Sequence, residues 1–251
     1  MISKSEINKI RSLDSKKGRD LYSLILIEGK RLIEQVITSN YNISKIWITD
    51  DFSNKNANLI SKIKDISIDL ISDRDLKKIT ATQNPSGIVG VLEIPKGNPE
   101  KLNQPLIILD NIADPGNLGT ILRTAEWFGI HNVALSKDCV DPYNSKVVRS
   151  AMGAHFNMNI IRIKIEEYIK KLQSDNFQII AADLNTDKSI ESLNLKNDKW
   201  ALLMGSEAHG LSPSVKNLID CKIKIPQVGK IESLNVSVAC GIFLYHMSKI
   251  K

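Results

Sequence analysis

The sequence is most informative between residues 225 and 239, which read Ile225-Pro226-Gln227-Val228-Gly229-Lys230-Ile231-Glu232-Ser233-Leu234-Asn235-Val236-Ser237-Val238-Ala239. We expect an apolar strand to end near Pro226, a turn to follow at Gly229, and a helix of small residues to begin at Ser233. Backbone N–H groups and short polar side chains at such a strand-to-helix turn can face a bound ligand. Residues 225–239 therefore predict a ligand site at the carboxyl end of a strand.

Two earlier segments also place glycine and polar side chains after an expected apolar strand. Asp114-Pro115-Gly116-Asn117 follows the uniformly apolar strand expected at 106–109, and Arg123 lies within the helix expected at 118–128. Gly205-Ser206-Glu207-Ala208-His209-Gly210 follows a second apolar strand, expected at 201–204. Arginine has planar donors suited to phosphate, and glycines let the backbone approach a ligand closely. A single turn of this kind could simply be a helix cap or a surface loop, but three such turns in one domain favour a functional site.

The order of strands and helices predicts an α/β fold in two domains. Short strands alternate with helices between residues 24 and 92, which indicates a small α/β domain. Residues 96–103 have the proline and glycine content of a linker, so we expect domains at 1–95 and 104–251. The second domain repeats the alternation, and its first strand, at 106–109, is uniformly apolar. A parallel sheet with helices on both sides, and ligands at the strands' carboxyl ends, is expected there.

Composition narrows the class of protein without deciding its function. The 251 residues are 42% hydrophobic and 25% charged, with a net charge of +6, which permits an anionic partner such as nucleic acid. The three cysteines are far apart and have no metal-ligand spacing, as expected of reduced thiols. The first residues carry charges where a signal peptide is apolar, and no stretch is long enough to span a bilayer. We therefore expect a cytoplasmic protein.

Several familiar catalytic motifs are absent from the sequence. No Gly-x-Gly-x-x-Gly pattern opens a helix, and Lys230 lacks the surroundings of a phosphate-binding P-loop. No Gly-x-Ser-x-Gly nucleophile elbow and no cluster with metal spacing are present, so no metal is expected. Common dinucleotide, nucleoside triphosphate and serine hydrolase chemistries are therefore disfavoured.

Taken in their order along the chain, the three segments resemble the motifs of the SpoU/TrmH family of RNA 2′-O-ribose methyltransferases, within the SPOUT superfamily. The resemblance covers residues 104–251 and extends more weakly to 20–95, which look like a substrate-binding domain. It implies a C-terminal α/β trefoil-knot domain with a parallel sheet and S-adenosyl-L-methionine as the cofactor. It also implies a homodimer packed through the catalytic domain, with no membrane involved.

The resemblance also assigns roles to individual residues. By this resemblance, five residues line the end of the site where the methyl group reacts: Asn117, Arg123, Glu207, Ser233 and Asn235. The backbones implied to hold the adenine and ribose of the cofactor lie near Leu203, Gly205, Ile225, Gln227 and Leu234, and Gly205 and Gly229 would leave room for it. The residues expected to bind RNA are the basic cluster Lys16, Lys17 and Arg19 together with Arg149, which matches a family position facing RNA.

The mechanism implied is in-line attack of a ribose 2′-hydroxyl on the sulfonium methyl group. Because a guanidinium cannot act as a base, we expect Arg123 to hold the adjacent phosphate and polarise the hydroxyl. Asn117, Glu207 and Ser233 would orient the substrate or Arg123. Ribosomal RNA is favoured as the substrate. The alternatives are a transfer RNA ribose methyltransferase, a base methyltransferase, a non-catalytic RNA-binding protein on the same scaffold, and an enzyme acting on a small nucleotide.

Overall fold

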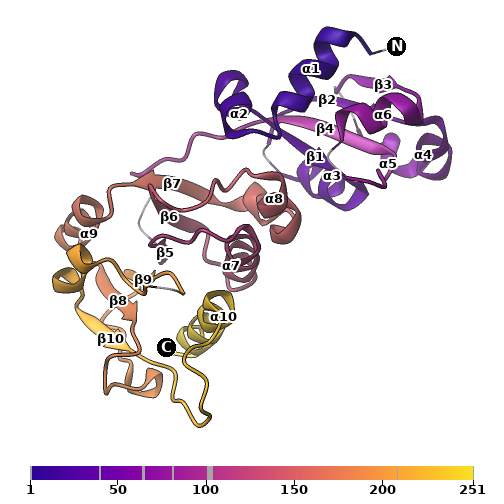
Figure 1. The fold of residues 1–251 in the computed structure, drawn as a ribbon. Helices are drawn as coiled ribbons and strands as arrows, with labels where there is room; N and C mark the ends of the chain where they lie inside the picture. The colour runs from indigo at the N-terminus through magenta and orange to yellow at the C-terminus, as the bar shows by residue number, and fades with distance from the viewer. Residues whose placement is uncertain are drawn as a thin grey trace. The chain divides into compact units, whose positions relative to one another are not determined.

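A computed structural model describes residues 2–39, 41–63, 66–80, 82–100, 104–207 and 209–250. The chain divides into two compact units (Figure 1). The first unit contains Met1–Lys96 and Tyr143–Phe156, and the second contains Gly97–Pro142 and Asn157–Lys251. The expected linker at 96–103 falls partly outside the described residues. No helix among the described residues is both long and apolar enough to cross a membrane.

The first unit is built on a mixed sheet of four strands in the order β1-β4-β2-β3. Its strands are β1 (Leu24–Glu28), β2 (Ile43–Ile48), β3 (Ile68–Leu70) and β4 (Ile88–Glu93). Its helices are α1 (Lys4–Ser12), α2 (Lys16–Tyr22), α3 (Lys30–Ile37), α4 (Asp50–Lys55), α5 (Ala57–Ile60), α6 (Asp73–Ile79) and α8 (Ser145–Ala151), with a 3₁₀ turn at η1 (Ala154–Asn157). Strand β4 runs antiparallel to both β1 and β2, and β3 runs parallel to β2.

The two faces of this sheet pack against different helices. Side chains alternate along β1, so Ile25 and Ile27 join the core beneath α3, α4 and α5, while Leu24 and Leu26 pack on the core beneath α1 and α6. This alternation places one layer of helices on each face. Between β2 and β3 the chain forms two short helices, α4 and α5, which meet at the non-helical residue Asn56.

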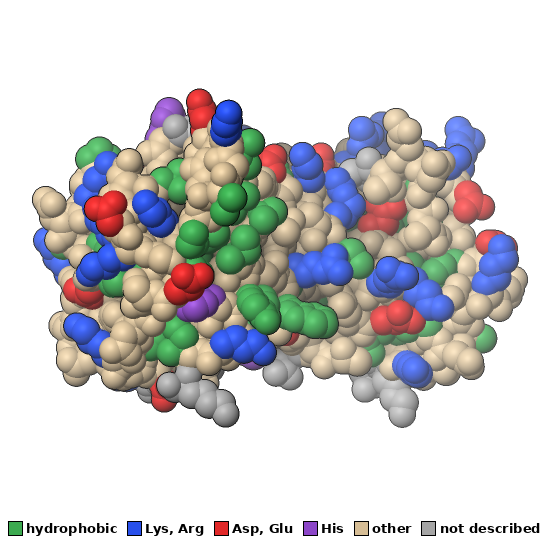
Figure 2. Space-filling model, turned by 90° about the horizontal axis from the view of Figure 1, so that it is seen from below, with side chains coloured by type: hydrophobic (Ala, Val, Ile, Leu, Met, Phe, Trp, Pro, Cys, Tyr) green, Lys and Arg blue, Asp and Glu red, His purple; other side chains and the backbone are tan. Residues whose placement is uncertain are grey.

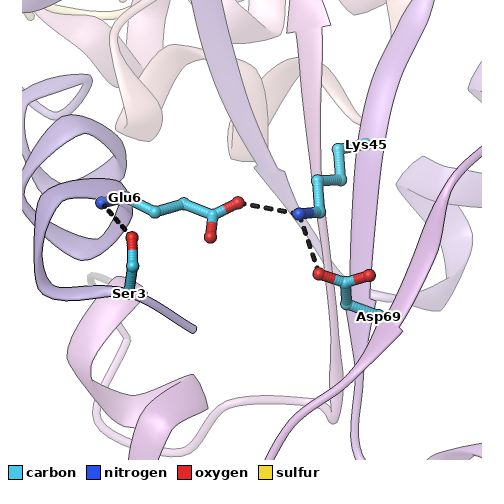
Figure 3. Close-up of polar contacts among 4 residues, drawn as sticks. All are labelled: Ser3, Glu6, Lys45 and Asp69. Carbon is cyan, nitrogen blue, oxygen red and sulfur yellow. Dashed lines mark hydrogen bonds and ion pairs between the residues drawn. The ribbon is translucent and has the colours of Figure 1, made fainter. Parts of the chain in front are cut away.

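Helix α1 is tied to the sheet by an ion-pair network (Figure 3). The Lys45 Nζ atom on β2 lies 2.8 Å from Glu6 Oε1 on α1 and 2.7 Å from Asp69 Oδ2 on β3. The Ser3 hydroxyl caps α1 by accepting a hydrogen bond from the Glu6 N–H. Desolvation lowers the pKa of Lys45, but its hydrogen bonds to Asp69 and Glu6 outweigh this and raise the pKa overall.

A segment distant in sequence completes the core of the first unit. Val148 on α8 and Phe156 on η1 are buried in the same cluster as Ile33 and Ile46. The Tyr41 hydroxyl donates to the His155 carbonyl at 3.0 Å. Residues 143–156 therefore pack with the N-terminal fold although both flanking segments belong to the second unit.

The second unit contains a parallel sheet of six strands in the order β10-β8-β9-β5-β6-β7. These are β5 (Leu106–Leu109), β6 (Asn132–Ser136), β7 (Asn159–Ile163), β8 (Gln178–Ala182), β9 (Trp200–Met204) and β10 (Cys221–Ile223). The helices are α7 (Pro115–Trp127), α9 (Ile165–Ser174) and α10 (Val236–Met247), with 3₁₀ turns η2 (Ile190–Ser192) and η3 (Pro213–Leu218). The expected parallel sheet is confirmed.

The helices of the second unit lie on both sides of its sheet (Figure 1). Helix α9 and η3 share one core with the sheet, through Ile169, Leu172 and Val215, while α10 packs on α7. After β10 at the edge of the sheet, the chain returns through residues 224–235 to place α10 beside the helix that follows the central strand β5. This return is the step that a knotted fold requires.

Two helix starts differ from the expected positions because side-chain caps define them. Helix α7 begins at Pro115 rather than Leu118, since the Asp114 side chain caps it. Helix α10 begins at Val236 rather than Ser233, since Asn235 is its cap and accepts from the N–H groups of Ser237 and Val238. The expected helix residues 233–235 are therefore loop and cap.

Candidate functional site

The sheet register of the second unit brings two of the functional segments together. Leu109 at the end of β5 pairs with Met204 at the end of β9, and the Asp110 N–H donates to the Met204 carbonyl at 2.9 Å. Because these parallel neighbours end at the same edge, the segments that follow them start side by side. The segment after β5 leads to α7, and the segment after β9 is the loop at 205–212.

The start of α7 is held by its own cap. Asp114 Oδ1 accepts a hydrogen bond of 2.8 Å from the Asn117 N–H, and Pro115 occupies the first turn. Since this bond involves the Asn117 backbone, the Asn117 side chain remains available for contacts outside the helix.

The loop after β9 is a tight turn closed by its own backbone. The Ser206 N–H donates to the Gly210 carbonyl at 3.1 Å, and the Gly210 N–H donates back to the Ser206 carbonyl at 2.9 Å. Gly210 has a φ of +64°, which favours glycine. A Cβ atom on Gly205 would lie 2.4 Å from the Gly210 carbonyl carbon. The buried Asp110 carboxylate fixes the end of the loop by accepting from the Ser212 N–H at 2.8 Å.

The three functional segments meet in one hydrogen-bonded cluster, which we call the amide–carboxylate cluster: Asn117, Glu207 and Asn235. Glu207 Oε1 accepts from Asn235 Nδ2 at 2.7 Å, from the Val236 N–H at 2.9 Å and from Asn117 Nδ2 at 3.2 Å. Asn235 Nδ2 also donates to Asn117 Oδ1 at 2.9 Å. Glu207 and Asn235, which follow Asn117 by 90 and 118 positions in the sequence, are thus hydrogen-bonded to it directly.

A cavity of about 480 Å³ lies beside this cluster. Its size suits a cofactor, since small-molecule sites span roughly 300–1,000 Å³. It is lined by residues from the ends of β8, β9 and β10 and from the loop leading to α10, among them Gly205, Glu207, Ile225, Gln227, Ser233 and Leu234. Four of the five expected cofactor-binding positions therefore line it, whereas Leu203 is buried within β9 and does not.

The reason for glycine differs from the expected one at Gly205 but not at Gly229. Gly205 is required by the protein itself, because a side chain would collide with the Gly210 backbone. Gly229 lines the cavity, and a Cβ atom there would meet no protein atom within 4 Å. Only at Gly229 could the space be needed for a ligand.

Arg123 lies apart from the amide–carboxylate cluster in the single chain. It is exposed on α7 and is not among the residues that line the cavity. Trp127, one turn further along α7, is 83% exposed. The structure therefore joins Asn117, Glu207 and Asn235, adds Ser233 at the cavity wall, and leaves Arg123 on the outer surface of the helix.

Helices α7 and α10 present an exposed apolar surface, which consists of Trp127, Val238, Ile242 and Tyr245. Gly241 of α10 approaches Thr124 of α7, and the rings of Phe128 and Tyr245 lie 6.4 Å apart. The two helices thus form one continuous face. Hydrophobic side chains reach the surface in groups on the face drawn in Figure 2.

The residues expected to bind RNA have different surroundings in the first unit. Lys16 and Lys17 are exposed on α2, and Arg149 is exposed on α8. Arg19 is only 2% exposed, and its Nη1 atom donates to the carbonyls of Leu13 and Asp14 at 2.8 Å each. Its guanidinium therefore holds the turn between α1 and α2, which corrects the expectation that Arg19 faces RNA.

Some residues at the site were missed by sequence reasoning. Asp183, Leu184 and Asn185 line the cavity, and Asp110 anchors the loop at Ser212. Asp110 directly follows β5, and the other three directly follow β8. Their position at carboxyl ends of parallel strands was a signal that could have identified them.

The chain is similar to two known protein families and to individual methyltransferases. The family model of the SpoU rRNA methylase family matches residues 104–245, and that of the MRM3-like substrate binding domain matches residues 4–90. The chain is 29% identical over 240 residues to the 23S rRNA (guanosine(2553)-2′-O)-methyltransferase RlmP of Bacillus subtilis, covering 94% of this chain and 93% of the relative. It is 31% identical to an uncharacterized tRNA/rRNA methyltransferase of Synechocystis, covering 95% and 89%.

A solved structure matches over both units. The AdoMet-bound rRNA methyltransferase from Sinorhizobium meliloti has a TM-score of 0.86 and 27% identity, covering 98% of this chain and 95% of that one. The similarity includes the sheet that carries the cavity and the N-terminal unit.

Proposed function

Because the chain belongs to the SpoU rRNA methylase family, we propose that ribosomal RNA is its substrate and that the amide–carboxylate cluster is the centre of its active site. As a member of this family, the protein is an S-adenosylmethionine-dependent RNA 2′-O-ribose methyltransferase. Support for ribosomal RNA comes from the family model and from the similarity to RlmP over nearly the whole chain.

The observation that carries the site assignment is the convergence of three distant segments on one carboxylate oxygen. Glu207 Oε1 accepts hydrogen bonds from two side-chain amides and one backbone N–H. These three hydrogen bonds use the acceptor capacity of that oxygen. Glu207 is therefore proposed to hold the two asparagine amides in place rather than to act as the base.

The cavity beside the cluster fits the cofactor in size and in the kind of residues that line it. Gly205, Ile225, Gln227 and Leu234 would hold the adenine and ribose through their backbones, and Gly229 leaves space in the wall. When bound, S-adenosylmethionine supplies an electrophilic methyl group. The chain's own contribution is to orient the ribose hydroxyl toward that group and to exclude water.

Arg123 is proposed to bind the phosphate next to the methylated ribose and to polarise its 2′-hydroxyl. Its planar guanidinium donates well to phosphate oxygens and stays protonated. Ser233 at the cavity wall, with Asn117 at the start of α7, would orient the hydroxyl or Arg123.

A homodimer is proposed to complete the site. Trp127, Val238, Ile242 and Tyr245 form a face of large exposed side chains on α7 and α10, of the kind that protein interfaces bury. Arg123 lies one turn from Trp127 on α7 and outside the cavity of its own chain. Pairing through this face would bring Arg123 to the boundary between two copies, where it could serve an active site.

The two parts of the chain are proposed to have different roles, methyl transfer in one and RNA binding in the other. Residues 104–251 would form the methyltransferase domain, and 1–95 would bind the RNA substrate through Lys16 and Lys17, together with Arg149 on α8. Residues 96–103 would link them. A cytoplasmic location is also proposed, supported by three cysteines without a disulfide bond.

The direct test is methyl transfer to ribosomal RNA isolated from cells that lack the protein. With radiolabelled S-adenosylmethionine, we expect one labelled ribose in the large or small ribosomal RNA, resistant to alkaline cleavage on its 3′ side. Transfer RNA from the same cells is the control substrate. Labelling of transfer RNA alone would reject the ribosomal assignment, and calorimetry showing no uptake of S-adenosylmethionine would reject the cofactor site.

A further inference from the structure

We propose that Leu21 and Tyr22, at the end of α2, form a stacking platform for an unpaired base of the RNA substrate. This inference rests on the proposed function, since it assigns a contact to the RNA that the enzyme methylates. The platform belongs wholly to the first unit and is separate from the cavity and the amide–carboxylate cluster.

Helices α1 and α2 meet in a closely packed corner (Figure 1). A Cβ atom on Gly18 would lie 2.0 Å from the Ser12 carbonyl oxygen, so the two helices approach as only glycine allows. The buried Arg19 guanidinium bonds the carbonyls of Leu13 and Asp14. The Ser15 hydroxyl caps α2 by accepting from the Gly18 N–H. A rigid corner reduces the entropy lost when a ligand binds to it.

The exposure of Leu21 and Tyr22 is unusual for this unit. Leu21 is 70% exposed and Tyr22 is 39% exposed. Among the described residues of the first unit, Leu70 on β3 is the one other large hydrophobic side chain that is exposed. Two of these three side chains are thus adjacent on one short helix. A flat aromatic surface in solvent suits stacking of an unpaired base, whatever the base.

The charges around the platform favour a polyanion as its occupant. Between residues 9 and 22, the exposed cations Lys9, Arg11, Lys16 and Lys17 outnumber the exposed carboxylates Asp14 and Asp20. The Lys9 Nζ atom lies 5.0 Å from the centre of the Tyr22 ring. The Lys9 ammonium covers one face of the ring and would have to move aside for a base to stack there, and a phosphate of the RNA would give it a new partner. This charge complementarity favours RNA over a protein partner.

The test measures RNA affinity of the full-length enzyme with Tyr22→Leu, which keeps an apolar side chain but removes the ring. Binding of ribosomal RNA from cells lacking the enzyme should weaken about 5- to 150-fold, which corresponds to the ~1–3 kcal/mol of one base–aromatic stack. Tyr22→Phe should bind within twofold of wild type. The KM for RNA should rise in Tyr22→Leu, with kcat at saturating RNA unchanged.

The matched control is Leu70→Ser, which removes the third exposed hydrophobic side chain and should leave RNA affinity unchanged. Leu21→Ser should weaken binding. Crosslinking of wild-type enzyme to RNA that carries 4-thiouridine should label the peptide containing Tyr22, a result that needs no variant to fold. Unchanged RNA affinity in a stably folded Tyr22→Leu, or crosslinks only to other peptides, would overturn the platform. A change in sedimentation with RNA affinity preserved would instead assign the surface to a protein contact.

Measurements on the wild-type enzyme distinguish a wrong substrate from a wrong assignment of the stacking platform. Failure of wild type to methylate ribosomal RNA would reject the proposed substrate. Normal methylation and S-adenosylmethionine binding, together with an unaffected Tyr22→Leu, would reject the stacking platform alone.

Discussion

The two units organise their polar side chains in opposite ways. In the second unit, Asn117, Glu207 and Asn235 come from three distant segments and are locked together by short hydrogen bonds. In the first unit, Lys16 and Lys17 come from one short helix and extend into solvent. The first arrangement fixes geometry, and the second supplies charge. Changes in the second unit should therefore alter the rate of methyl transfer, and changes on α2 should alter RNA affinity and its dependence on salt.

The largest effect is expected from Glu207→Ala. It removes the acceptor of three hydrogen bonds and leaves two amides and a backbone N–H unpaired. We expect single-turnover methyl transfer to fall by about 100- to 1,000-fold, the range seen when one preorganised polar group is lost. Glu167→Ala, on the exposed surface of α9, is the control and should retain full activity. A Glu207→Ala enzyme with a normal rate would show that the cluster is structural only.

The next effect is expected from Arg123→Ala, which removes the proposed phosphate and hydroxyl contact. The rate of methyl transfer should fall by about 100-fold, while calorimetry should give a Kd for S-adenosylmethionine within twofold of wild type. Arg123→Lys should recover only part of the rate, because an ammonium lacks the planar pair of donors. Unchanged turnover in Arg123→Ala would remove this residue from the active site.

A smaller effect is expected from Trp127→Asp, which places a charge in the apolar face of α7 and α10. Sedimentation should show a shift from dimer to monomer, because a charge buried at an interface is costly. Activity should fall about tenfold or more at low protein concentration and recover as concentration rises. Leu70→Asp, at an exposed leucine on β3 of the first unit, is the control and should stay dimeric. A monomeric wild type would contradict the proposed homodimer.

A salt-dependent effect is expected from the double variant Lys16→Gln and Lys17→Gln. The slope of log K for RNA against log salt should decrease by about 1–2, since each phosphate contact contributes just under one unit. The value of kcat at saturating RNA should not change. Lys62→Gln with Lys77→Gln, an exposed pair elsewhere in the same unit, tests whether any two lysines have the same effect. An equal loss in both pairs would mean that the charge on α2 has no special role.

The smallest effect is expected from Lys45→Gln, which removes the two ion pairs that tie α1 to β2 and β3. Because the network is partly solvent-exposed, the first unit should lose about 1 kcal/mol or less of its free energy of unfolding. Chemical denaturation with a probe in the first unit measures this loss. Binding of S-adenosylmethionine in the second unit should stay constant, and a parallel loss there would show that the two units do not unfold independently.

Much of the fold could be predicted because local signals agreed with it. The uniformly apolar run at 106–109 is a buried parallel strand, as its composition indicated. The start of α10 was misplaced because its polar cap was read as part of the helix. Asn235 was placed inside α10, but its side chain accepts bonds from the next turn and so ends the loop instead.

The candidate site was predicted in its segments but not in its contacts. Each turn at a strand end was visible locally, whereas the bond between Asn235 and Asn117 depends on the path of the whole chain. Arg19 shows the converse, because a cationic side chain in a basic cluster looks exposed until the tertiary fold buries it against two carbonyls. Sequence spacing does not report which carbonyls lack a partner.

The packing of residues 143–156 has a consequence for how the protein is made. Val148 and Phe156 are part of the first unit's core, so that core cannot close while the ribosome has supplied only the first hundred residues. Domains usually fold as units in the order of their synthesis. Here the earlier unit is complete only after β5 and β6, two of the six strands of the second sheet, have been synthesised, and a fragment ending at Lys96 would expose the apolar surface that α8 and η1 cover. Translation of the second unit therefore finishes the folding of the first.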